Sequence, residues 1–438
     1  MALRFGTDGV RAEALTQLTV EFARALGAAA AQTLGGEAIV IGRDTRESGP
    51  ALARAFAEGA ASEDLTIVDL GVVPTPAVAW VCNADGLPGA MISASHNPWR
   101  DNGIKLFAAS GRKLSDSDQD EIQVQLDEAH AAGYPLVGVE PVINFASADR
   151  YIDAVVSSVA VGAFDGQTVV LDSANGSAST TAKTIFERLG ATVVSLADEP
   201  DGRNINDGVG SNHPDLLQAA VLEHSADAGF AFDGDADRIA AVGRDGSLID
   251  GDRIIAMSAL DRLDRGTLAH NTVVVTVMTN LGFRRAMEAE GLTLVETGVG
   301  DRYVLEALDA GGYTLGGEQS GHVIHRDLAT TGDGVLTAVQ LFDAVRRRGV
   351  DMGEWAASVM TQFPQVLENV RMPEKLPNLT ELLADAVKAE EALLGADGRV
   401  LIRESGTEPV VRVMVEAADA TVAVASAQRL VEAVEALR

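Results

Sequence analysis

Short apolar runs that end abruptly in small polar residues recur along this chain. Gly89–Ile92 gives way to serines at 93 and 95, and Ala228–Phe232 gives way to a run of aspartates. Between such runs lie segments with apolar residues at helical spacing, such as 19–34 and 334–348. Apolar runs alternating with helical segments predict buried strands and an α/β fold. Because ligands bind α/β sheets at the carboxyl ends of strands, the polar residues stand where a site is expected.

The α/β pattern repeats three times and then changes character after Pro364. Two strand-like runs, 399–403 and 410–416, flank a glycine-containing turn, and a helix from about 419 to 437 closes the sequence. A chain of 438 residues can bury several cores. We therefore predict three similar β/α domains and a smaller C-terminal α+β domain. The predicted domains are residues 1–147, 148–248, 249–362 and 363–438.

The composition limits the partners and the compartment. A formal charge of −30 argues against nucleic acid or an anionic membrane as a partner. Cys82 is the only cysteine, which excludes an intrachain disulfide and a cysteine-based zinc site. No apolar stretch is long enough to span a bilayer, and no signal-peptide pattern opens the sequence, so we expect a cytoplasmic protein. Adaptation to salt and compositional bias explain the acidity equally well.

A serine, a histidine and a lysine follow the strand predicted at Gly89–Ile92. Ser95 stands at the mouth of the predicted sheet, His96 beside it can carry a proton, and Lys105 adds a fixed positive charge a short loop away. These are the residue types that a serine needs to give and take a charged group. On this segment alone, a polar turn with Ser or Asn capping a helix is an equally good interpretation.

Three carboxylates at alternate positions, Asp233, Asp235 and Asp237, follow the run at 228–232. Charges so close repel one another unless a hard cation such as Mg²⁺ lies between them. A calcium loop of the EF-hand type would need Gly and Glu where Arg238 and Arg244 stand, so that interpretation fails. The alternative is an acidic loop in solvent. We favour a metal site.

Two glycine-containing loops further along carry groups suited to a sugar phosphate. Glu318 in the loop at 316–322 can accept hydrogen bonds from sugar hydroxyls. The loop at 403–409, with Arg412 after it, resembles an anion cradle of backbone N–H groups, hydroxyls and arginines. Ordinary glycine hairpins are the alternative for both loops. No P-loop and no G-x-G-x-x-G sequence occurs, which argues against an NTPase or a dehydrogenase.

The motifs together resemble the α-D-phosphohexomutases, and among them the phosphoglucosamine mutase branch. Four motifs occur in that family's order: Ser-Ala-Ser-His-Asn-Pro at 93–98, Asp-Gly-Asp-Ala-Asp-Arg at 233–238, Gly-Glu-Gln-Ser-Gly-His at 317–322 and Arg-Glu-Ser-Gly-Thr-Glu-Pro at 403–409. Further segments at 5–11, 42–46, 299–304 and 330–334 resemble the glucosamine branch, so the resemblance covers essentially the whole chain. Ala12 and Gly298 depart from the family's usual residues.

The resemblance implies a fold of three similar β/α domains with mixed sheets plus a smaller C-terminal α+β domain, heart-shaped around a central cleft. It implies that Ser95 carries a phosphoryl group and, through that group, completes the site of one Mg²⁺. The residues implied as the other metal ligands are Asp233, Asp235 and Asp237. Those implied around the transferred group are His96, Lys105, Arg11, Arg238 and His322. Those implied to bind substrate are Glu318, Ser320, Arg302, Arg403, Ser405, Gly406, Thr407 and Arg412.

The implied reaction moves a phosphoryl group between the two ends of glucosamine phosphate. Phosphoserine donates its phosphoryl group to glucosamine 6-phosphate and gives glucosamine 1,6-bisphosphate, which also primes the enzyme. The free serine then accepts the other phosphoryl group of the bisphosphate. His96 and Lys105 are both candidates for proton transfer. A homodimer is a possible assembly, and the product would feed UDP-N-acetylglucosamine and cell-wall synthesis.

Three rival functions remain in view. The first is a phosphomannomutase or phosphoglucomutase of the same superfamily, which differs in the sugar it prefers. The second is a metal-dependent phosphatase that forms a seryl phosphate, although no histidine neighbours the aspartate loop as such sites usually require. The third is a non-catalytic sensor of sugar phosphates, which would not need the serine or the aspartates that are present here.

Overall fold

The structure, a computed structural model, describes residues 3–4, 9–132, 142–376, 378–404 and 409–438. The chain divides into two compact units, the first of Met1–Val277 and Thr293–Ala357 and the second of Met278–Leu292 and Ser358–Arg438. Three of the sheets formed by the described residues lie in the first unit and one lies in the second. The predicted fold class, mixed α/β sheets followed by a smaller α+β part, is confirmed. Residues 133–141, near the end of the first predicted domain, lie outside the described residues.

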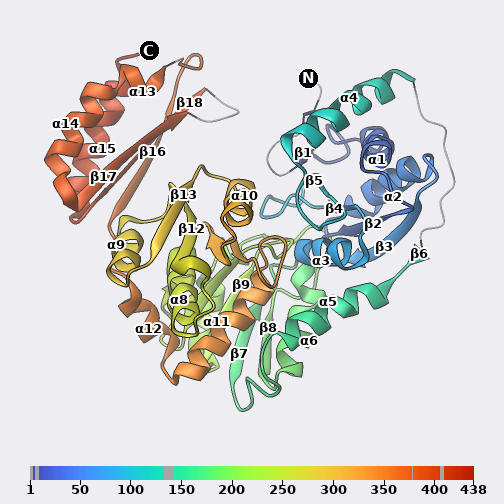
Figure 1. Cartoon of the computed structure of the whole chain (residues 1–438), viewed down its shortest axis with the longest axis horizontal. Coiled ribbons are helices and arrows are strands. Elements are labelled where there is room, and N and C mark those ends of the chain that lie inside the picture. The colour runs from blue at the N-terminus through green and yellow to red at the C-terminus, as the bar shows by residue number, and fades with distance from the viewer. Residues whose placement is uncertain (1–2, 5–8, 133–141, 377, 405–408) are drawn as a thin grey trace. The chain divides into compact units, whose positions relative to one another are not determined.

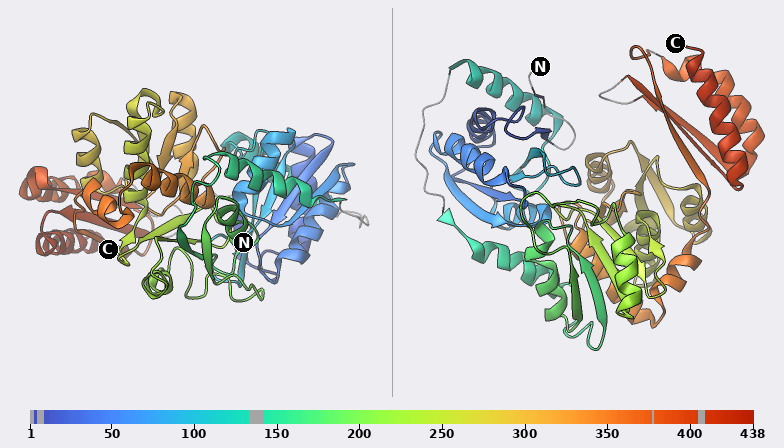
Figure 2. Two further views of the ribbon diagram at one scale, coloured as in Figure 1. Left: turned by 90° about the horizontal axis from the view of Figure 1, so that it is seen from below. Right: turned by 180° about the vertical axis from the view of Figure 1, so that it is seen from behind.

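The first sheet is mixed, and it supplies the serine. Its parallel strands are β4, β2, β3 and β6, while β5 runs antiparallel to both of its neighbours, β1 and β4. In spatial order the strands are β1 (Val10–Glu13), β5 (Asp101–Phe107), β4 (Gly89–Ile92), β2 (Ala38–Arg43), β3 (Thr66–Val72) and β6 (Val142–Ile143). Helices α1 (Val20–Leu34), α2 (Gly49–Ala61) and α4 (Asp116–Ala132) lie on one face, and α3 (Thr75–Asp85) and α5 (Phe145–Ser157) lie on the other (Figures 1 and 2).

The second sheet supplies the aspartates from the turn of an antiparallel pair, β9–β10. In spatial order the strands are β11 (Leu248–Ile249), β10 (Ile239–Gly243), β9 (Ala228–Phe232), β7 (Thr168–Asp172) and β8 (Thr192–Leu196). Apolar residues of α7 (Asp215–Glu223) pack on one face. On the other face Phe230 of β9 meets aromatic rings from α6 (Ala182–Arg188) and α11 (Gly334–Arg348). The short 3-10 helix η1 (Ser177–Thr180) precedes α6.

The third sheet adjoins the second through a shared helix. In spatial order its strands are β13 (Thr293–Thr297), β12 (Thr272–Thr276), β14 (Leu315–Gly317) and β15 (Val323–His325). Helix α10 (Asp301–Gly311) packs on one face, and the short 3-10 helix η2 (Ala269–Asn271) precedes β12. Helix α11 contacts β15, α8 (Gly251–Asp264) and also β9 and β10 of the second sheet. This shared packing brings the loop at 316–322 to the aspartate loop.

The second unit is an antiparallel sheet with helices on it. Its strands, in spatial order, are β16 (Gln365–Arg371), β18 (Val410–Ala417) and β17 (Gly398–Glu404), and its helices are α13 (Leu379–Leu382), α14 (Ala384–Leu394) and α15 (Ala420–Glu435). Helix α9 (Leu281–Ala289) belongs to this unit as well. Glu416, which is fully buried, accepts hydrogen bonds from the Leu281 N–H (3.0 Å) and Arg399 Nε (2.6 Å). Helix α12 (Met352–Val359) crosses the point in the sequence where the first unit ends and the second resumes. The 3-10 helix η3 (Gly395–Asp397) lies in the second unit, directly before β17.

Local sequence signals located most elements well. Helix α11 and strand β4 have the predicted bounds, and Thr19 caps α1 by accepting a hydrogen bond from the Phe22 N–H. Strand β12 ends at Thr276, and the Asn280 side chain then caps α9 by accepting a hydrogen bond from the Gly282 N–H. None of the helices within the described residues has both the length and the apolar character needed to cross a bilayer.

Candidate active site

Ser95 lies in a tight turn after β4. The strand is buried throughout, and Ser95 itself is 1% exposed with a φ of 51°, a left-handed conformation uncommon for a residue other than glycine. Its Oγ donates a hydrogen bond to Asp233 Oδ2 and lies 3.4 Å from His96 Nδ1. The serine of the first sheet therefore meets the aspartate loop of the second, as the sequence motifs predicted.

The three aspartates form a buried cluster suited to a metal ion. One carboxylate oxygen from each of Asp233, Asp235 and Asp237 lies within 4.8 Å of the others. Within the described residues, Asp235 Oδ1 and Asp237 Oδ1 are buried and accept no hydrogen bond. Buried carboxylate oxygens without donors are costly unless a cation meets them. Their number and chemistry fit Mg²⁺, which prefers oxygen ligands.

Lys105, on β5, brings a positive charge into direct contact with this cluster. Its Nζ lies 2.5 Å from Asp235 Oδ2 and 3.2 Å from Asp237 Oδ2, and the residue is 1% exposed. Burial alone would lower the pKa of Lys105, but the charges of Asp235 and Asp237 raise it above its ordinary value. Lys105 is therefore a cation at neutral pH.

His96 is electrostatically different from Lys105. Burial, followed by the positive charges of Arg238 and Arg11, lowers the pKa of His96 to about 4. The imidazole is therefore neutral at neutral pH. Arg11 lies on β1, opposite Gly103 of β5, so the edge of the first sheet brings it toward the serine turn.

Arg238 and His322 also lie next to the aspartates. The Arg238 N–H donates to Asp233 Oδ1 (3.1 Å), and Arg238 Nε lies 4.0 Å from Asp237 Oδ1. His322 Nδ1 lies 3.8 Å from Asp237 Oδ1, and its Nε2 lies 3.3 Å from Asp301 Oδ2. Burial lowers the pKa of His322, but Asp301 and Asp237 raise it above its ordinary value overall.

The loop between β14 and β15 carries Glu318 and Ser320. Glu318 is partly buried and accepts a hydrogen bond from the Gly300 N–H (3.1 Å), whereas Ser320 is exposed. Burial raises the pKa of Glu318. Gly321 has a φ of 87°, and a Cβ there would lie 2.0 Å from the Ile239 carbonyl oxygen, so only glycine allows the loop to approach β10 this closely.

Arg302, at the start of α10, is engaged by acidic side chains. Its Nε lies 2.9 Å from Glu306 Oε1, and its Nη1 pairs with Asp116 of α4. Arg302 thus ties the third sheet's helix to the first sheet's acidic helix.

The predicted phosphate cradle lies in the second unit. Arg403 on β17 and Arg412 on β18 are directly opposite each other and both are partly buried. Burial and the charge of Arg412 lower the pKa of Arg403. Like charges placed directly opposite are destabilising unless an anion joins them. Ser405, Gly406 and Thr407 lie outside the described residues.

Several residues of the site escaped the sequence analysis. Thr75 Oγ1 donates a hydrogen bond to Asp235 Oδ2 (2.6 Å), and Asp301 forms an ion pair with Lys113. The Arg-Asp-Thr-Arg segment at 43–46 contacts the serine turn through Arg46 and Asp44, and no local pattern in the segment predicts those contacts. Thr75 stands between two prolines at a helix start, which signals a turn and nothing about metal chemistry.

Models of one protein family match nearly the whole chain, including all the loops described above. Sequence models described as phosphoglucomutase/phosphomannomutase match the chain in four consecutive parts: alpha/beta/alpha domain I at residues 2–132, domain II at 149–246, domain III at 250–363 and the C-terminal domain at 367–433.

Individual proteins are similar over nearly the whole chain. A phosphoglucosamine mutase of Thermobifida fusca (strain YX) is 51% identical over an alignment of 443 residues, which covers 99% of this chain and 98% of that protein. A phosphoglucosamine mutase of Corynebacterium glutamicum is 48% identical over 96% of both chains.

Solved structures have the same fold. A phosphoglucomutase/phosphomannomutase family protein of Burkholderia thailandensis has a TM-score of 0.81 at 25% identity, with 98% of this chain and 97% of that chain covered. An N-acetylphosphoglucosamine mutase of Aspergillus fumigatus, in complex with GlcNAc-6P and magnesium, has a TM-score of 0.71 at 18% identity, covering 99% and 96%, and shows likeness of fold alone.

Proposed function

Because this chain belongs to the phosphoglucomutase/phosphomannomutase family, we propose that it is a phosphoglucosamine mutase that interconverts glucosamine 6-phosphate and glucosamine 1-phosphate. The resemblance inferred from the motifs is thereby confirmed. The observation that carries the proposal is the full-length identity of 51% with a phosphoglucosamine mutase, in a chain whose serine meets a cluster of three buried aspartates.

In this proposal Ser95 holds the phosphoryl group in the resting enzyme. Ser95 Oγ passes the group to the free hydroxyl of the bound sugar phosphate, which gives glucosamine 1,6-bisphosphate. After the bisphosphate turns over, Ser95 Oγ accepts the other phosphoryl group, and the isomeric monophosphate leaves. The P–O bond broken at one oxygen is replaced by one formed at the other, so no water is consumed.

Asp233, Asp235 and Asp237 would hold one Mg²⁺, together with an oxygen of the phosphoryl group on Ser95. The ion, when bound, neutralises charge on the phosphoryl group as it moves between oxygens. Its support comes from the buried carboxylate oxygens that accept no hydrogen bond within the described residues.

The surrounding cations and the proton carrier have separate tasks. We assign the proton transfer at the serine to His96, because its Nδ1 is 3.4 Å from Ser95 Oγ while Lys105 is paired with two carboxylates. Lys105, Arg11, Arg238 and His322 then stabilise negative charge around the transferred group.

The remaining groups would bind the substrate. Glu318, with Ser320 and Arg302, would contact the sugar, and the pair Arg403–Arg412 would bind the phosphate that does not react, together with Ser405, Gly406 and Thr407. One cradle can serve both orientations of the bisphosphate. We further propose that the protein works in the cytoplasm, possesses the four domains predicted from its sequence, and feeds UDP-N-acetylglucosamine synthesis.

The test is the intact mass of the purified protein before and after incubation with glucosamine 1,6-bisphosphate and Mg²⁺, with the added phosphate mapped by fragmentation. One phosphate on Ser95 is expected. Turnover of glucosamine 1-phosphate is then compared with that of glucose 1-phosphate and mannose 1-phosphate. Preference for glucose or mannose would replace the sugar assignment with a phosphoglucomutase or phosphomannomutase, and absence of phosphate on Ser95 would overturn the mutase.

A further inference from the structure

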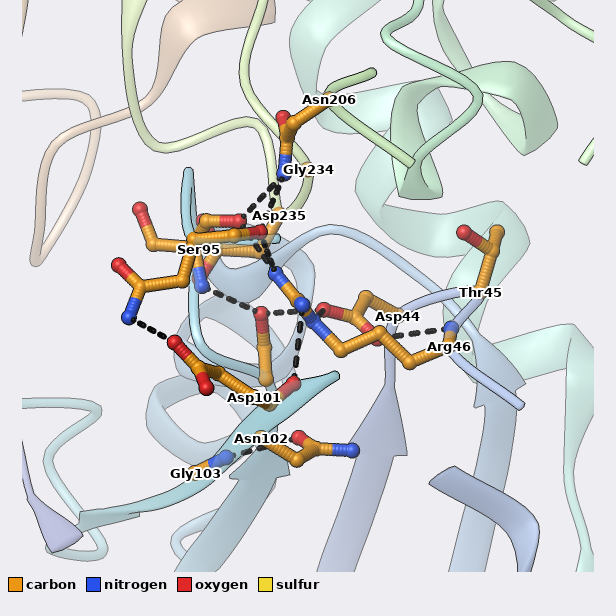
Figure 3. Close-up of polar contacts among 12 residues, drawn as sticks. Asp44, Thr45, Arg46, Ser95, Asp101, Asn102, Gly103, Asn206, Gly234 and Asp235 are labelled. Carbon is orange, nitrogen blue, oxygen red and sulfur yellow. Dashed lines mark hydrogen bonds and ion pairs between the residues drawn. The ribbon is translucent and has the colours of Figure 1, made fainter. Parts of the chain in front are cut away.

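Arg46 is fully buried behind the serine turn, and the proposed reaction gives it no task. An arginine offers five N–H donors in a rigid fork. Nε donates to Asp44 Oδ2 (2.9 Å), and the two terminal nitrogens donate only to backbone carbonyls (Figure 3). Those carbonyl oxygens belong to Ser95 (2.8 Å), Asn97 (2.8 Å), Asp101 (2.9 Å) and Pro98. Both terminal nitrogens of this side chain thus hold the segment that contains Ser95, while Nε binds the carboxylate of Asp44.

The backbone of Ser95 is held at both ends by one closed ring of hydrogen bonds. Its N–H donates to Ser93 Oγ (2.9 Å), and the Ser93 hydroxyl donates to Asp44 Oδ2 (2.6 Å). That oxygen accepts Arg46 Nε, and Arg46 Nη2 returns to the Ser95 carbonyl oxygen. A residue at positive φ keeps that conformation only when its surroundings fix it. The ring is what fixes Ser95.

The second sheet reaches the same carbonyl group. Asn206 Nδ2 donates to the Ser95 carbonyl oxygen (2.9 Å) and to the Asn97 carbonyl oxygen (3.2 Å). A Cβ on Gly234 would lie 2.7 Å from the Ser95 carbonyl oxygen, so the aspartate loop also passes close to it. Loops of the first and second sheets therefore meet at the Ser95 carbonyl group, and this contact fixes the position of the serine relative to the aspartates (Figure 3).

We propose that Arg46 is a positioning residue for phosphoryl transfer, and that Asn206 supports it from the second sheet. The inference rests on the proposed function. Asp44 balances the charge of Arg46, and all side-chain N–H donors of Arg46 are engaged. The effect of Arg46 is therefore geometric: it keeps Ser95 Oγ directed at the aspartate cluster. Displacing a reacting atom by about 1 Å can cost roughly 10²-fold in rate.

The first test is Arg46→Lys, which keeps the charge and removes the planar fork. We expect kcat, and the rate at which glucosamine 1,6-bisphosphate phosphorylates Ser95, to fall roughly 10²-fold. KM for glucosamine 1-phosphate should stay within about twofold, since no substrate contact is lost. The matched control is Arg24→Lys. Arg24 lies on α1, which packs on the same sheet, and it also binds a carboxylate, that of Glu58, through two nitrogens, but among the described residues it makes no hydrogen bond to the serine turn. Its rates should equal those of the wild type.

Asn206→Gly tests the inference without a buried charge, in case Arg46→Lys does not fold. Asn206 has a φ of 57°, which glycine adopts without strain. We expect about a tenfold fall in kcat at constant KM and a wild-type circular dichroism spectrum. If wild-type Ser95 is phosphorylated and the folded variants match its kcat, or if the loss lies in KM, positioning is refuted and the mutase stands. If wild-type Ser95 takes no phosphate, both proposals fall.

Discussion

Two buried groups of charges flank Ser95, and they are built differently. Behind the serine, Asp44 and Arg46 pair one to one, and all donors of the arginine are engaged. In front, three carboxylates crowd together, and two of their oxygens accept no hydrogen bond within the described residues. Burial raises the pKa of both Asp44 and Asp233. At Asp44 the charge of Arg46 opposes that effect, whereas at Asp233 the charges of Asp237 and Asp235 add to it and bring the pKa to about 7.

The difference indicates that the Asp44–Arg46 pair has a structural role and that the three aspartates have a chemical one. A balanced and satisfied pair holds the chain in place and needs nothing from solution. A surplus of one charge with oxygens left over needs a ligand, and the protein bears the repulsion until the ligand binds. Five substitutions test this contrast.

The largest effect is expected from Ser95→Ala. Turnover should fall by at least about 10⁴-fold, because the nucleophile is lost while both charged groups remain. The affinity for glucosamine 6-phosphate, measured by calorimetry with Mg²⁺, should stay close to that of the wild type. Activity near the wild-type level would remove the serine from the mechanism. Loss of binding would mean that the aspartate cluster and the Asp44–Arg46 pair are not maintained without the Ser95 hydroxyl.

The same change, Asp to Asn, should act with opposite sign on the two sides of the serine. Asp44→Asn leaves the buried charge of Arg46 unpaired and should cost about 3–5 kcal/mol of unfolding free energy. Asp233→Asn removes one of three repelling carboxylates and should add about 1 kcal/mol or more at pH 8 with EDTA. Urea denaturation of the three proteins provides the comparison.

Mg²⁺ should then make the wild type more stable than Asp233→Asn, which reverses the order of their unfolding free energies in EDTA. A ligand at about 100 times its Kd stabilises the wild type by about 2.7 kcal/mol, and Asp233→Asn should lose most of that gain. Destabilisation by Asp233→Asn in EDTA would contradict a repulsive cluster.

Arg412→Ala extends the contrast to the second unit, where two arginines face each other as a surplus of positive charge. Removing one should raise KM about tenfold or more while kcat changes less, since the phosphate it binds does not react. Steady-state kinetics with glucosamine 1-phosphate measure the split. An unchanged KM would argue against the cradle.

The smallest effect is expected from Thr75→Val, which preserves shape and removes the hydroxyl that Asp235 Oδ2 accepts. Partners that orient metal ligands typically contribute 10–100-fold in affinity. Because Lys105 also holds this oxygen, we expect a change near the lower end, about tenfold in the Mg²⁺ concentration for half-maximal activity. No change would show that Lys105 alone orients Asp235.

Much of the fold was predictable because its signals are local. The apolar run at Gly89–Ile92, the cap at Thr19 and the helix Gly334–Arg348 each follow from neighbouring residues, and each matches the structure. Helix α9 shows the limit of such signals. It lies within the predicted third domain, and the structure groups it with the second unit, where the Leu281 N–H at its start donates a hydrogen bond to buried Glu416, far along the chain.

The sequence alone determined which chemical groups are present and the order of the loops that carry them: the serine with His96, the three aspartates, Glu318 and the arginine pair. Only the tertiary structure decided how they are held. Arg46 lies 49 positions from Ser95, Asn206 lies 111 positions from it, and Thr75 lies 160 positions from Asp235. Periodicity reports the face of a single helix or strand, whereas these contacts depend on how separate sheets pack, and no pattern of neighbouring residues encodes that.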